Sequence, residues 1–300
     1  MVQRLLSMLL TIWLAATLTF FTLRVLPGDA ISAQLAQSGA GQGSIEQMRS
    51  QMGLDAPVPT QYVRFIAGLA RGDLGNSLLS GQRVSDMLYQ RFWPTLQLAV
   101  SAMVVATLAG IGLGVAAAFG SHLSFGARIL VNLSISTPIY WTGTMAIVLF
   151  SAKLGWLPST GTGRLEHLVL PVSILGFHTM GGIARVTQAS VASTRQEIFV
   201  WVARSKGLSE RHLIWQHILR VGLLPVITMI ALQMGFLLSG TIITESLFVR
   251  PGIGRLLLNS TIEQDYPIVQ GVVILSAVVY VTLTTLADFL HRLVDPRITL

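Results

Sequence analysis

Charged residues are absent from six long stretches of this chain, and these stretches are mostly apolar. Their lengths are 19 residues (5–23), 36 (92–127), 24 (129–152), 18 (167–184), 24 (221–244) and 22 (266–287). A helix needs about 20 apolar residues to cross the hydrocarbon core of a membrane. The stretches lack the two-residue alternation of barrel strands, which favours helices. We therefore predict an all-α integral membrane protein with six transmembrane helices, at about 5–25, 95–119, 129–151, 167–190, 224–246 and 267–288.

The longest uncharged stretch, 92–127, could hold one span or a span and a half. Pro94 is placed to start its helical part, since the first turn of a helix tolerates a missing N–H. Gly120 and Ser121 are placed to end it. One helix over about 95–119 is therefore predicted.

Composition supports a membrane protein, because 52% of the residues are hydrophobic and only 11% are charged. Ordinary soluble domains are roughly 25% charged. The chain has no cysteine, which excludes a disulfide scaffold, a zinc finger and a thiol nucleophile. The net charge of +7 could indicate a nucleic-acid binder. In a membrane protein it more often records basic residues that face the cytoplasm, so we expect lipid and no nucleic acid as a partner.

The short loops predict the orientation. If Met1 is cytoplasmic, the inside segments hold Arg4, Arg128, Arg185, Arg195, Arg204, Lys206, Arg211, Arg220, Arg292 and Arg297, and the short outside loops hold Lys153, Arg164, Arg250 and Arg255. This excess predicts that both termini are cytoplasmic. The apolar stretch 5–23 is longer than the roughly 7–15 residues typical of a signal peptide, which favours an uncleaved anchor.

The segment 27–93 is predicted to be extracytoplasmic and is too long for a simple turn. Two pieces have apolar side chains at helical spacing: Ile45, Met48 and Met52, then Tyr62, Phe65, Ile66 and Leu69. Ser44 and Gly53 are a plausible start and stop for the first piece. The segment is either a small cap over the outer mouth or a docking surface for a delivered ligand, and one part can do both.

The cytoplasmic segment 191–223 is predicted to be a helical hairpin. Its first helix, Gln196–Lys206, has three apolar side chains on one face: Phe199, Val202 and Ala203. Gly207 follows, at a position where a left-handed C-terminal cap favours glycine. The hairpin's simplest interpretation is an ordinary connection between two spans.

Ser209 is placed to begin the second helix of the hairpin, which runs through His212, Trp215 and Ile218. Its basic residues, expected to face water or lipid headgroups, are Arg211 and Arg220. Pro225 sits at the entry of the fifth span, where its missing N–H costs little.

A phosphate-binding P-loop needs a Lys followed by Ser or Thr. Here Lys153 is followed by Leu154, and Lys206 by Gly207. The chain is therefore not expected to hydrolyse nucleotide by that mechanism, and it is expected to have no catalytic residues and no bound cofactor.

No metal site is expected, since the histidines include no His-Glu-x-x-His pair. His212 and His217 are five residues apart, which predicts that they lie off a common helix face. His178 falls near the middle of the fourth span. An ionisable side chain at that depth faces either a neighbouring helix or a water path, and an interhelical hydrogen bond is the favoured interpretation.

No acidic residue falls at the centre of a predicted span, because Glu245 and Asp288 lie near span ends. Ion-driven transporters usually carry a buried carboxylate relay, so energy for transport would come from elsewhere. Small and hydroxyl residues in the spans permit close helix packing. The alternative is a polar translocation path, for which the candidates are Ser136, His178 and Gln233.

The chain resembles the membrane permease subunit of ABC importers, in the dipeptide, oligopeptide and nickel branch of the binding-protein-dependent permeases. The residues that carry the resemblance are Leu26-Pro27-Gly28-Asp29, Gly53-Leu54-Asp55, Gly72-Asp73-Leu74-Gly75 with Ser77, Val202 to Glu210, His217-Ile218-Leu219-Arg220, Leu224-Pro225-Val226-Ile227, Glu245 with Pro251-Gly252-Ile253-Gly254-Arg255, Asp265-Tyr266-Pro267, and Asp295-Pro296-Arg297. They extend over essentially the whole chain. Val221-Gly222 and Ser205 depart from the family's commoner residues only slightly.

The resemblance implies a type I ABC importer permease fold in a bacterial inner membrane, with 191–223 as the EAA-type coupling loop. It implies that the ATPase-coupling residues are Glu197, Phe199, Val202, Ala203, Arg204, Lys206 and Gly207. The implied partners are a second, homologous permease subunit, two ATPase subunits that bind ATP and Mg²⁺, and an extracytoplasmic substrate-binding protein.

The implied cargo is a di- or oligopeptide, with nickel, a metal–chelator complex or glutathione as alternatives. A secondary transporter or channel that needs no ATPase is the rival from another class. It predicts net uptake by the isolated chain, whereas the permease interpretation predicts neither uptake nor ATP hydrolysis without partners.

Overall fold

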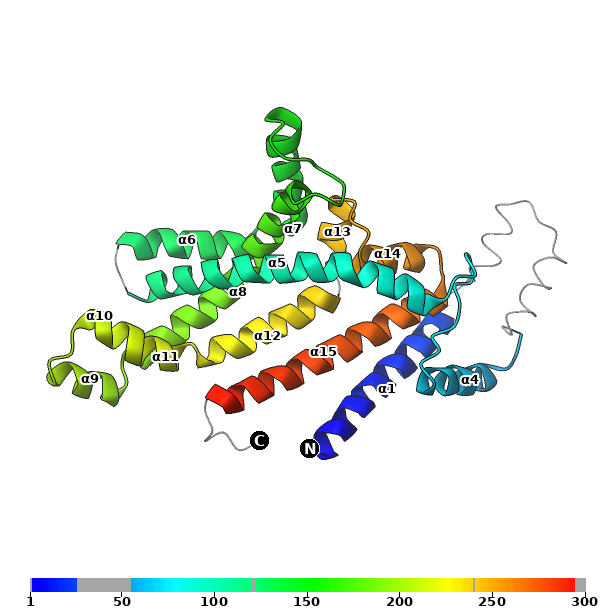
Figure 1. The fold of residues 1–300 in the computed structure, drawn as a ribbon, viewed down its shortest axis with the longest axis horizontal. Coiled ribbons are helices and arrows are strands. Elements are labelled where there is room, and N and C mark those ends of the chain that lie inside the picture. The colour runs from blue at the N-terminus through cyan, green and yellow to red at the C-terminus, as the bar shows by residue number, and fades with distance from the viewer. Residues whose placement is uncertain (1, 26–54, 120–121, 240, 295–300) are drawn as a thin grey trace. The chain divides into compact units, whose positions relative to one another are not determined.

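The structure is a computed structural model that describes residues 2–25, 55–119, 122–239 and 241–294. The described residues form helices and turns (Figure 1). Within these ranges the β-structure is limited to one isolated bridge, between Asn76 and Arg83. The predicted all-α class is therefore confirmed.

The described chain divides into two compact units. The first contains α1 (Val2–Val25), α4 (Val58–Ala70), α14 (Ile253–Ile262), the start of α5 (Val84–Ala118) and α15 (Tyr266–Val294) as far as Val281. The second contains the rest of α5, α6 (His122–Ser136), α7 (Ile139–Ala146), η1 (Ile147–Lys153), α8 (Glu166–Thr194), α9 (Ile198–Ser205), α10 (Glu210–Leu213), η2 (Ile214–Ile218), α11 (Leu219–Gly222), α12 (Leu224–Ser239) and most of α13 (Ile242–Leu247).

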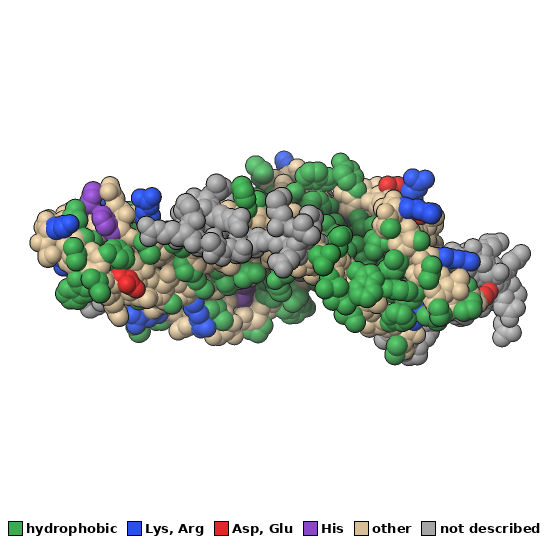
Figure 2. All heavy atoms as spheres, turned by 90° about the horizontal axis from the view of Figure 1, so that it is seen from below, with side chains coloured by type: hydrophobic (Ala, Val, Ile, Leu, Met, Phe, Trp, Pro, Cys, Tyr) green, Lys and Arg blue, Asp and Glu red, His purple; other side chains and the backbone are tan. Residues whose placement is uncertain are grey.

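Four helices are long and apolar enough to cross a membrane: Leu6–Val25, Val84–Ala118, Glu166–Thr194 and Tyr266–Leu286. Two bent pairs also qualify, namely Ser124–Ser136 with Ile139–Lys153 and Glu210–Gly222 with Leu224–Ser239. The total is six, as predicted, when each bent pair counts as one span. Hydrophobic side chains are common on the molecular face in Figure 2, consistent with a lipid environment.

The second predicted span begins earlier than the sequence indicated, and Pro94 lies inside α5 rather than at its start. The added turns are stabilised by burial, because Val84 and Leu88 pack in an apolar cluster of the first unit. Thr95 is also buried, and its Oγ1 accepts a hydrogen bond from the N–H of Ile253 at 2.8 Å. Tertiary packing thus overrides the helix-starting signal of the proline.

The third predicted span, 129–151, is not one continuous helix. It is broken after Ser136, and the two halves meet at 104°. Pro138 occupies the N-cap of α7, and a proline disfavours helical backbone at the residue before it, here Thr137. The prediction of a single helix is therefore corrected to two helical segments.

The second amphipathic piece of the outer segment is confirmed as α4, which packs on α1. Phe65 stacks on Phe20 with ring centroids 5.4 Å apart, and the hydroxyls of Tyr62 and Thr17 lie 2.8 Å apart. The predicted first piece (Ser44 to Gly53) lies outside the described residues, as do the motifs Leu26–Asp29 and Asp295–Arg297.

Asp265 is a buried acid in the first unit, and its carboxylate holds a turn before α5. It accepts hydrogen bonds from Ser77 Oγ at 2.5 Å and from the N–H of Leu78 at 3.1 Å. The adjoining apolar cluster consists of Val84, Leu88, Ile253, Leu256, Ile268 and Val272. This link joins two of the segments that carry the family resemblance.

Candidate functional site

The hairpin between α8 and α12 forms as predicted, with α9 as its first limb. The limb is shorter than the predicted Gln196–Lys206, since α9 covers Ile198–Ser205. Val200 and Ala203 point inward and are buried. The cluster around them consists of Val191, Val200, Ala203, Leu213, Ile218 and Leu219. Burial of this inner face fixes α9 against the second limb and the end of α8.

The second limb, Glu210–Gly222, is α10, η2 and α11 in sequence. Ser209 occupies the predicted N-cap position, without a side-chain capping hydrogen bond. The prediction that His212 and His217 lie off a common face is wrong, because their ring centroids are 6.1 Å apart. In an ordinary α-helix, residues five apart point in different directions. The segment η2 (Ile214–Ile218) is π-helical, and its i→i+5 bonds bring side chains five apart onto one side.

Gly207 ends the first limb in the predicted left-handed conformation, with φ of +82°. Its N–H donates to the carbonyl of Arg204 at 3.0 Å, and the N–H of Leu208 donates to the carbonyl of Ala203 at 3.4 Å. These two bonds are the Schellman pattern, which satisfies the last carbonyls of a helix. The turn between the limbs therefore has a defined backbone geometry.

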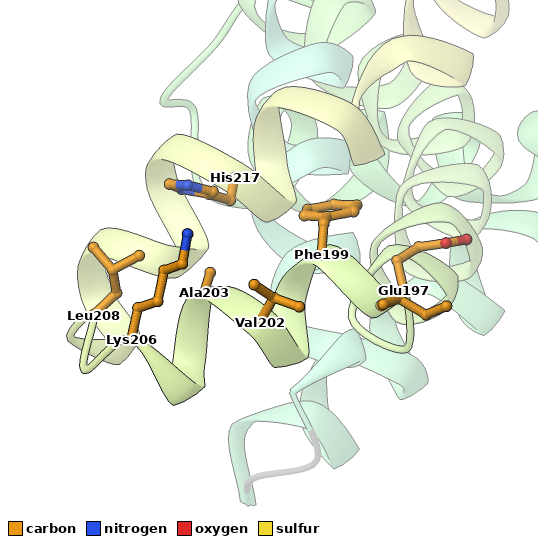
Figure 3. A pocket seen from close by; sticks show the side chains of 8 residues that line it. Glu197, Phe199, Val202, Ala203, Lys206, Leu208 and His217 are labelled. Atoms are coloured by element: carbon orange, nitrogen blue, oxygen red, sulfur yellow. The ribbon is translucent and has the colours of Figure 1, made fainter.

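Helix α9 also carries apolar side chains that are exposed. Ile198 is 78% exposed, Phe199 39% and Val202 45%. A groove of about 650 Å³ runs along α9, and its lining residues are Glu197, Ile198, Phe199, Val202, Ala203, Lys206, Leu208 and His217. Figure 3 shows side chains from α9 pointing toward the limb that carries His217. The groove therefore lies between the two limbs.

Two polar features mark the groove and its edge. His217 Nδ1 is buried and has no hydrogen-bond partner among the described residues. Buried polar atoms are normally hydrogen-bonded, and this nitrogen is an exception among the described residues. Glu197 lies at the start of α9 and Lys206 at its end, which gives the groove an acidic end and a basic end.

Arg204 and Glu210 form an exposed ion pair across the turn. Arg204 Nε donates to Glu210 Oε1 at 2.6 Å, and a second bond to Oε2 is 3.1 Å long. The hydrogen bond with Arg204 lowers the pKa of Glu210 below its usual value. The Arg204 guanidinium carbon also lies 5.8 Å from the ring centroid of Trp201. Arg204 thus braces the turn from the side away from the groove.

Two arginines contact the C-terminal end of α5, Arg195 at the start of the hairpin and Arg128 in α6. Arg195 donates to the carbonyl of Ala118 at 2.7 Å, and Arg128 donates to the carbonyl of Ala117 at 3.2 Å. The Arg195 guanidinium carbon also lies 4.4 Å from the ring centroid of Phe119. Cations near the last carbonyls of a helix are favourable. Arg195 therefore links the start of the hairpin to the end of α5.

The structure brings five of the seven predicted coupling residues into the groove: Glu197, Phe199, Val202, Ala203 and Lys206. The other two shape the turn, Gly207 by its backbone and Arg204 by its ion pair. Sequence reasoning missed Ile198, Leu208 and His217 as lining residues. Helical spacing from Val202 could have indicated Ile198, whereas His217 reaches the groove only because the second limb packs on the first.

The three candidate path residues lie on separate helices of the second unit. Ser136 is exposed at the end of α6. His178 Nε2 of α8 lies 2.7 Å from Thr142 Oγ1 of α7, which confirms the expected interhelical hydrogen bond. Gln233 of α12 packs near Gly182 of α8. Within the described residues no group of three or more metal-ligating side chains is found.

Comparison with known proteins decides the family. The model of the binding-protein-dependent transport system inner membrane component matches residues 110–300, and the model of its N-terminal part matches residues 1–99. The chain belongs to this family. It is therefore a permease subunit of an ABC importer in a bacterial inner membrane. The family implies an ATPase and a substrate-binding protein as partners.

The permease has curated relatives of nearly equal length. The glutathione transport system permease protein GsiC of Escherichia coli O6:H1 is 36% identical over 300 residues, which cover 99% of this chain and 97% of the relative. GsiC of Salmonella paratyphi A is also 36% identical, over 299 residues with the same coverage. GsiC of Escherichia coli (strain K12) is 35% identical over 300 residues, again with the same coverage.

Two solved structures share the permease's fold. A chain of the MetNI methionine ABC transporter in inward-facing conformations has a TM-score of 0.58 and 14% identity, and the match covers 70% of this chain and 96% of that chain. A chain of an amino acid ABC transporter with histidines has a TM-score of 0.53 and 15% identity, with 71% and 95% covered. At these identities the similarity supports the fold alone.

Proposed function

We propose that the hairpin is the element through which a separate ATPase subunit drives this permease. The seven residues assigned to coupling are Glu197, Phe199, Val202, Ala203, Arg204, Lys206 and Gly207. The observation that carries the proposal is the groove along α9, where Ile198, Phe199 and Val202 are exposed although they are apolar. Such a patch marks a site where another molecule binds.

The geometry of the turn supports transmission of force. The Schellman bonds at Gly207 and the buried contacts of Val200 and Ala203 hold α9 in a fixed orientation. Arg195 ties the start of the hairpin to α5. A displacement of α9 by a docked partner would therefore move α5 and α8 rather than bend a loose loop.

In this mechanism, ATP closes two ATPase subunits and shifts the permease from inward-open to outward-open. A shift from 1:99 to 99:1 requires about 5.5 kcal/mol of differential binding. Neither of the two lysines is followed by Ser or Thr as a P-loop requires. We therefore assign ATP and Mg²⁺ to the partner subunits, and we propose a second, homologous permease subunit to complete the pathway.

The cargo we propose is a short peptide, with glutathione as the first compound to test. The support is the name of the relatives, which are glutathione permeases at 35–36% identity. Glutathione is itself a tripeptide, so it belongs to the same chemical class. The proposed path residues Ser136, His178 and Gln233 can form hydrogen bonds, which the amide groups of a peptide also require.

Substitution of Gly207 tests the coupling role. In the assembled transporter, Gly207→Asp is expected to abolish ATP-driven uptake while membrane insertion is retained. Gly207→Asn is the matched control, because Asn has nearly the same size, lacks the charge and tolerates the left-handed conformation. It should retain most of the uptake. Full uptake by the Asp variant would contradict the proposal.

Uptake by proteoliposomes that contain the whole transporter and its binding protein tests the cargo. Labelled glutathione, a dipeptide mixture and nickel should be compared at equal concentration. We expect ATP-dependent accumulation of peptide or glutathione. Accumulation of nickel alone would overturn the cargo assignment but leave the coupling role intact.

A further inference from the structure

The second limb of the hairpin has an exposed face that is distinct from the groove. Leu213, Ile218 and Leu219 are buried against α9 and α8. Trp215 is 67% exposed and Val221 is 43% exposed. The basic residues Arg211 and Arg220 are also exposed, and these four side chains do not line the groove. The limb therefore presents apolar and cationic groups together on its outer side.

The length of α12 places this face close to the membrane. The helix has 16 residues, which extend about 24 Å, whereas the hydrocarbon core is about 30 Å thick. The second limb precedes it directly at a bend of 50°, and the two together are long and apolar enough to form a span. The end of the limb next to Leu224 therefore lies where α12 leaves the hydrocarbon core.

The residue types on the face match the headgroup layer. Tryptophan concentrates where the bilayer meets water, and amphipathic helices that lie at this level combine apolar contacts with basic side chains. Arginines near the cytoplasmic leaflet attract anionic lipid. The neighbouring acid Glu210 is paired with Arg204 across the turn, so it does not offset Arg211 fully.

We propose that the outer face of the second limb, formed by Arg211, Trp215 and Arg220, lies in the headgroup layer and binds anionic phospholipid of the cytoplasmic leaflet. This inference rests on the proposed function, because it takes the hairpin to be on the ATPase side of the membrane. The groove of the hairpin would then bind the ATPase subunit. The outer face of the second limb would fix the position of the hairpin relative to the bilayer.

The natural absence of cysteine allows a direct test. A spin label is attached at Trp215→Cys, and separately at Lys206→Cys in the groove, in the assembled transporter in nanodiscs of phosphatidylethanolamine and phosphatidylglycerol. At position 215 we expect collision with oxygen to exceed collision with a water-soluble nickel chelate. At position 206 we expect the reverse in the absence of ATPase, and protection from the chelate when ATPase binds.

The charge requirement is measured in the same nanodiscs. Arg211→Gln with Arg220→Gln should weaken the binding of phosphatidylglycerol at this face by about thirtyfold, since each arginine contributes about 1 kcal/mol, and so lower its enrichment around the transporter, while ATPase binding is unchanged. Arg64→Gln with Arg71→Gln, which alters two exposed arginines in α4 and at its C-cap, is the matched control and should leave this enrichment unchanged.

The outcomes separate the two proposals. A label at position 215 that is freely accessible to the nickel chelate, or that is shielded only when ATPase binds, would overturn the lipid contact. Equal phosphatidylglycerol enrichment in the wild type and the Arg211/Arg220 variant would overturn it as well. A label at position 206 that ATPase never protects would instead overturn the coupling role of the groove.

Discussion

Gly114 in α5 and Gly207 in the hairpin turn show two different uses of glycine. At Gly114, a Cβ atom would lie 2.5 Å from Thr187 Cβ and 2.6 Å from the carbonyl oxygen of Ala184, both in α8. At Gly207, a Cβ atom would meet nothing within 4 Å, but the φ of +82° is one that other residues rarely adopt. The first glycine provides space and the second provides backbone freedom.

The difference explains why only one of them could be assigned from the sequence. Gly207 ends an amphipathic pattern, and glycine after a helix is a local signal for a left-handed cap. Gly114 lies in an apolar run in which Gly110 and Gly112 are also present. Which of these approaches α8 depends on the packing of two helices that are far apart in the sequence.

The largest expected loss of stability is at the contact between α5 and α8. Gly114→Ala should destabilise the permease by about 1–3 kcal/mol, because the added methyl group meets backbone that cannot move freely. Gly112→Ala is the matched control in the same helix, where a Cβ atom has nothing within 4 Å. It should be neutral or stabilising by up to about 1 kcal/mol, since alanine favours the helix.

Unfolding of the two variants in detergent, followed by circular dichroism, measures the difference. If the Gly114 and Gly112 variants have the same free energy of unfolding, Gly114 is not needed for the close approach of α5 and α8. A third variant, Gly114→Ala with Thr187→Ser, removes the methyl group nearest to the new Cβ. It should recover only part of the loss, because the Cβ atom of residue 187 and the carbonyl oxygen of Ala184 remain.

A smaller loss of stability is expected at the polar contact between α7 and α8. Thr142→Val removes the hydroxyl that lies 2.7 Å from His178 Nε2 and keeps the side-chain volume. Interhelical hydrogen bonds in membranes contribute about 0.6 kcal/mol on average, so the loss should be of that order. Thr144→Val, whose hydroxyl bonds only within its own helix in the described structure, is the control. Equal unfolding free energies would show that the bond between α7 and α8 contributes nothing.

The sequence was sufficient for features that depend on local pattern. Apolar runs identified the spans, and Gly207 with the spacing of Phe199 and Val202 identified the hairpin. It was not sufficient where distant residues decide. Burial of Val84 and Leu88 extends α5 past Pro94. The π-helical turn that brings His212 beside His217 was also missed, although this feature is local. Pro138 is visible in the sequence, whereas the 104° bend beside it is not.

The smallest loss of stability is expected at the exposed ion pair of Arg204 and Glu210, which stabilises the turn. Because the hydrogen bond with Arg204 lowers the pKa of Glu210, the pair stabilises the folded turn at pH values above the ordinary carboxyl pKa of 4.5. That contribution is lost as the pH falls through the lowered pKa of the folded state. Salt weakens it as well, since both side chains are exposed.

Hydrogen exchange at the amide of Leu208, which closes the Schellman turn, reports this loss locally. After correction for intrinsic chemistry, its protection should fall below pH 4.5 in the wild type and show no such step in Glu210→Gln. The position of the step also tests the structure, because an ion pair must shift it below the value of a free carboxyl group. A wild-type turn whose protection matches that of Glu210→Gln at every pH would mean that Gly207 and the buried face of α9 hold the turn without help from charge.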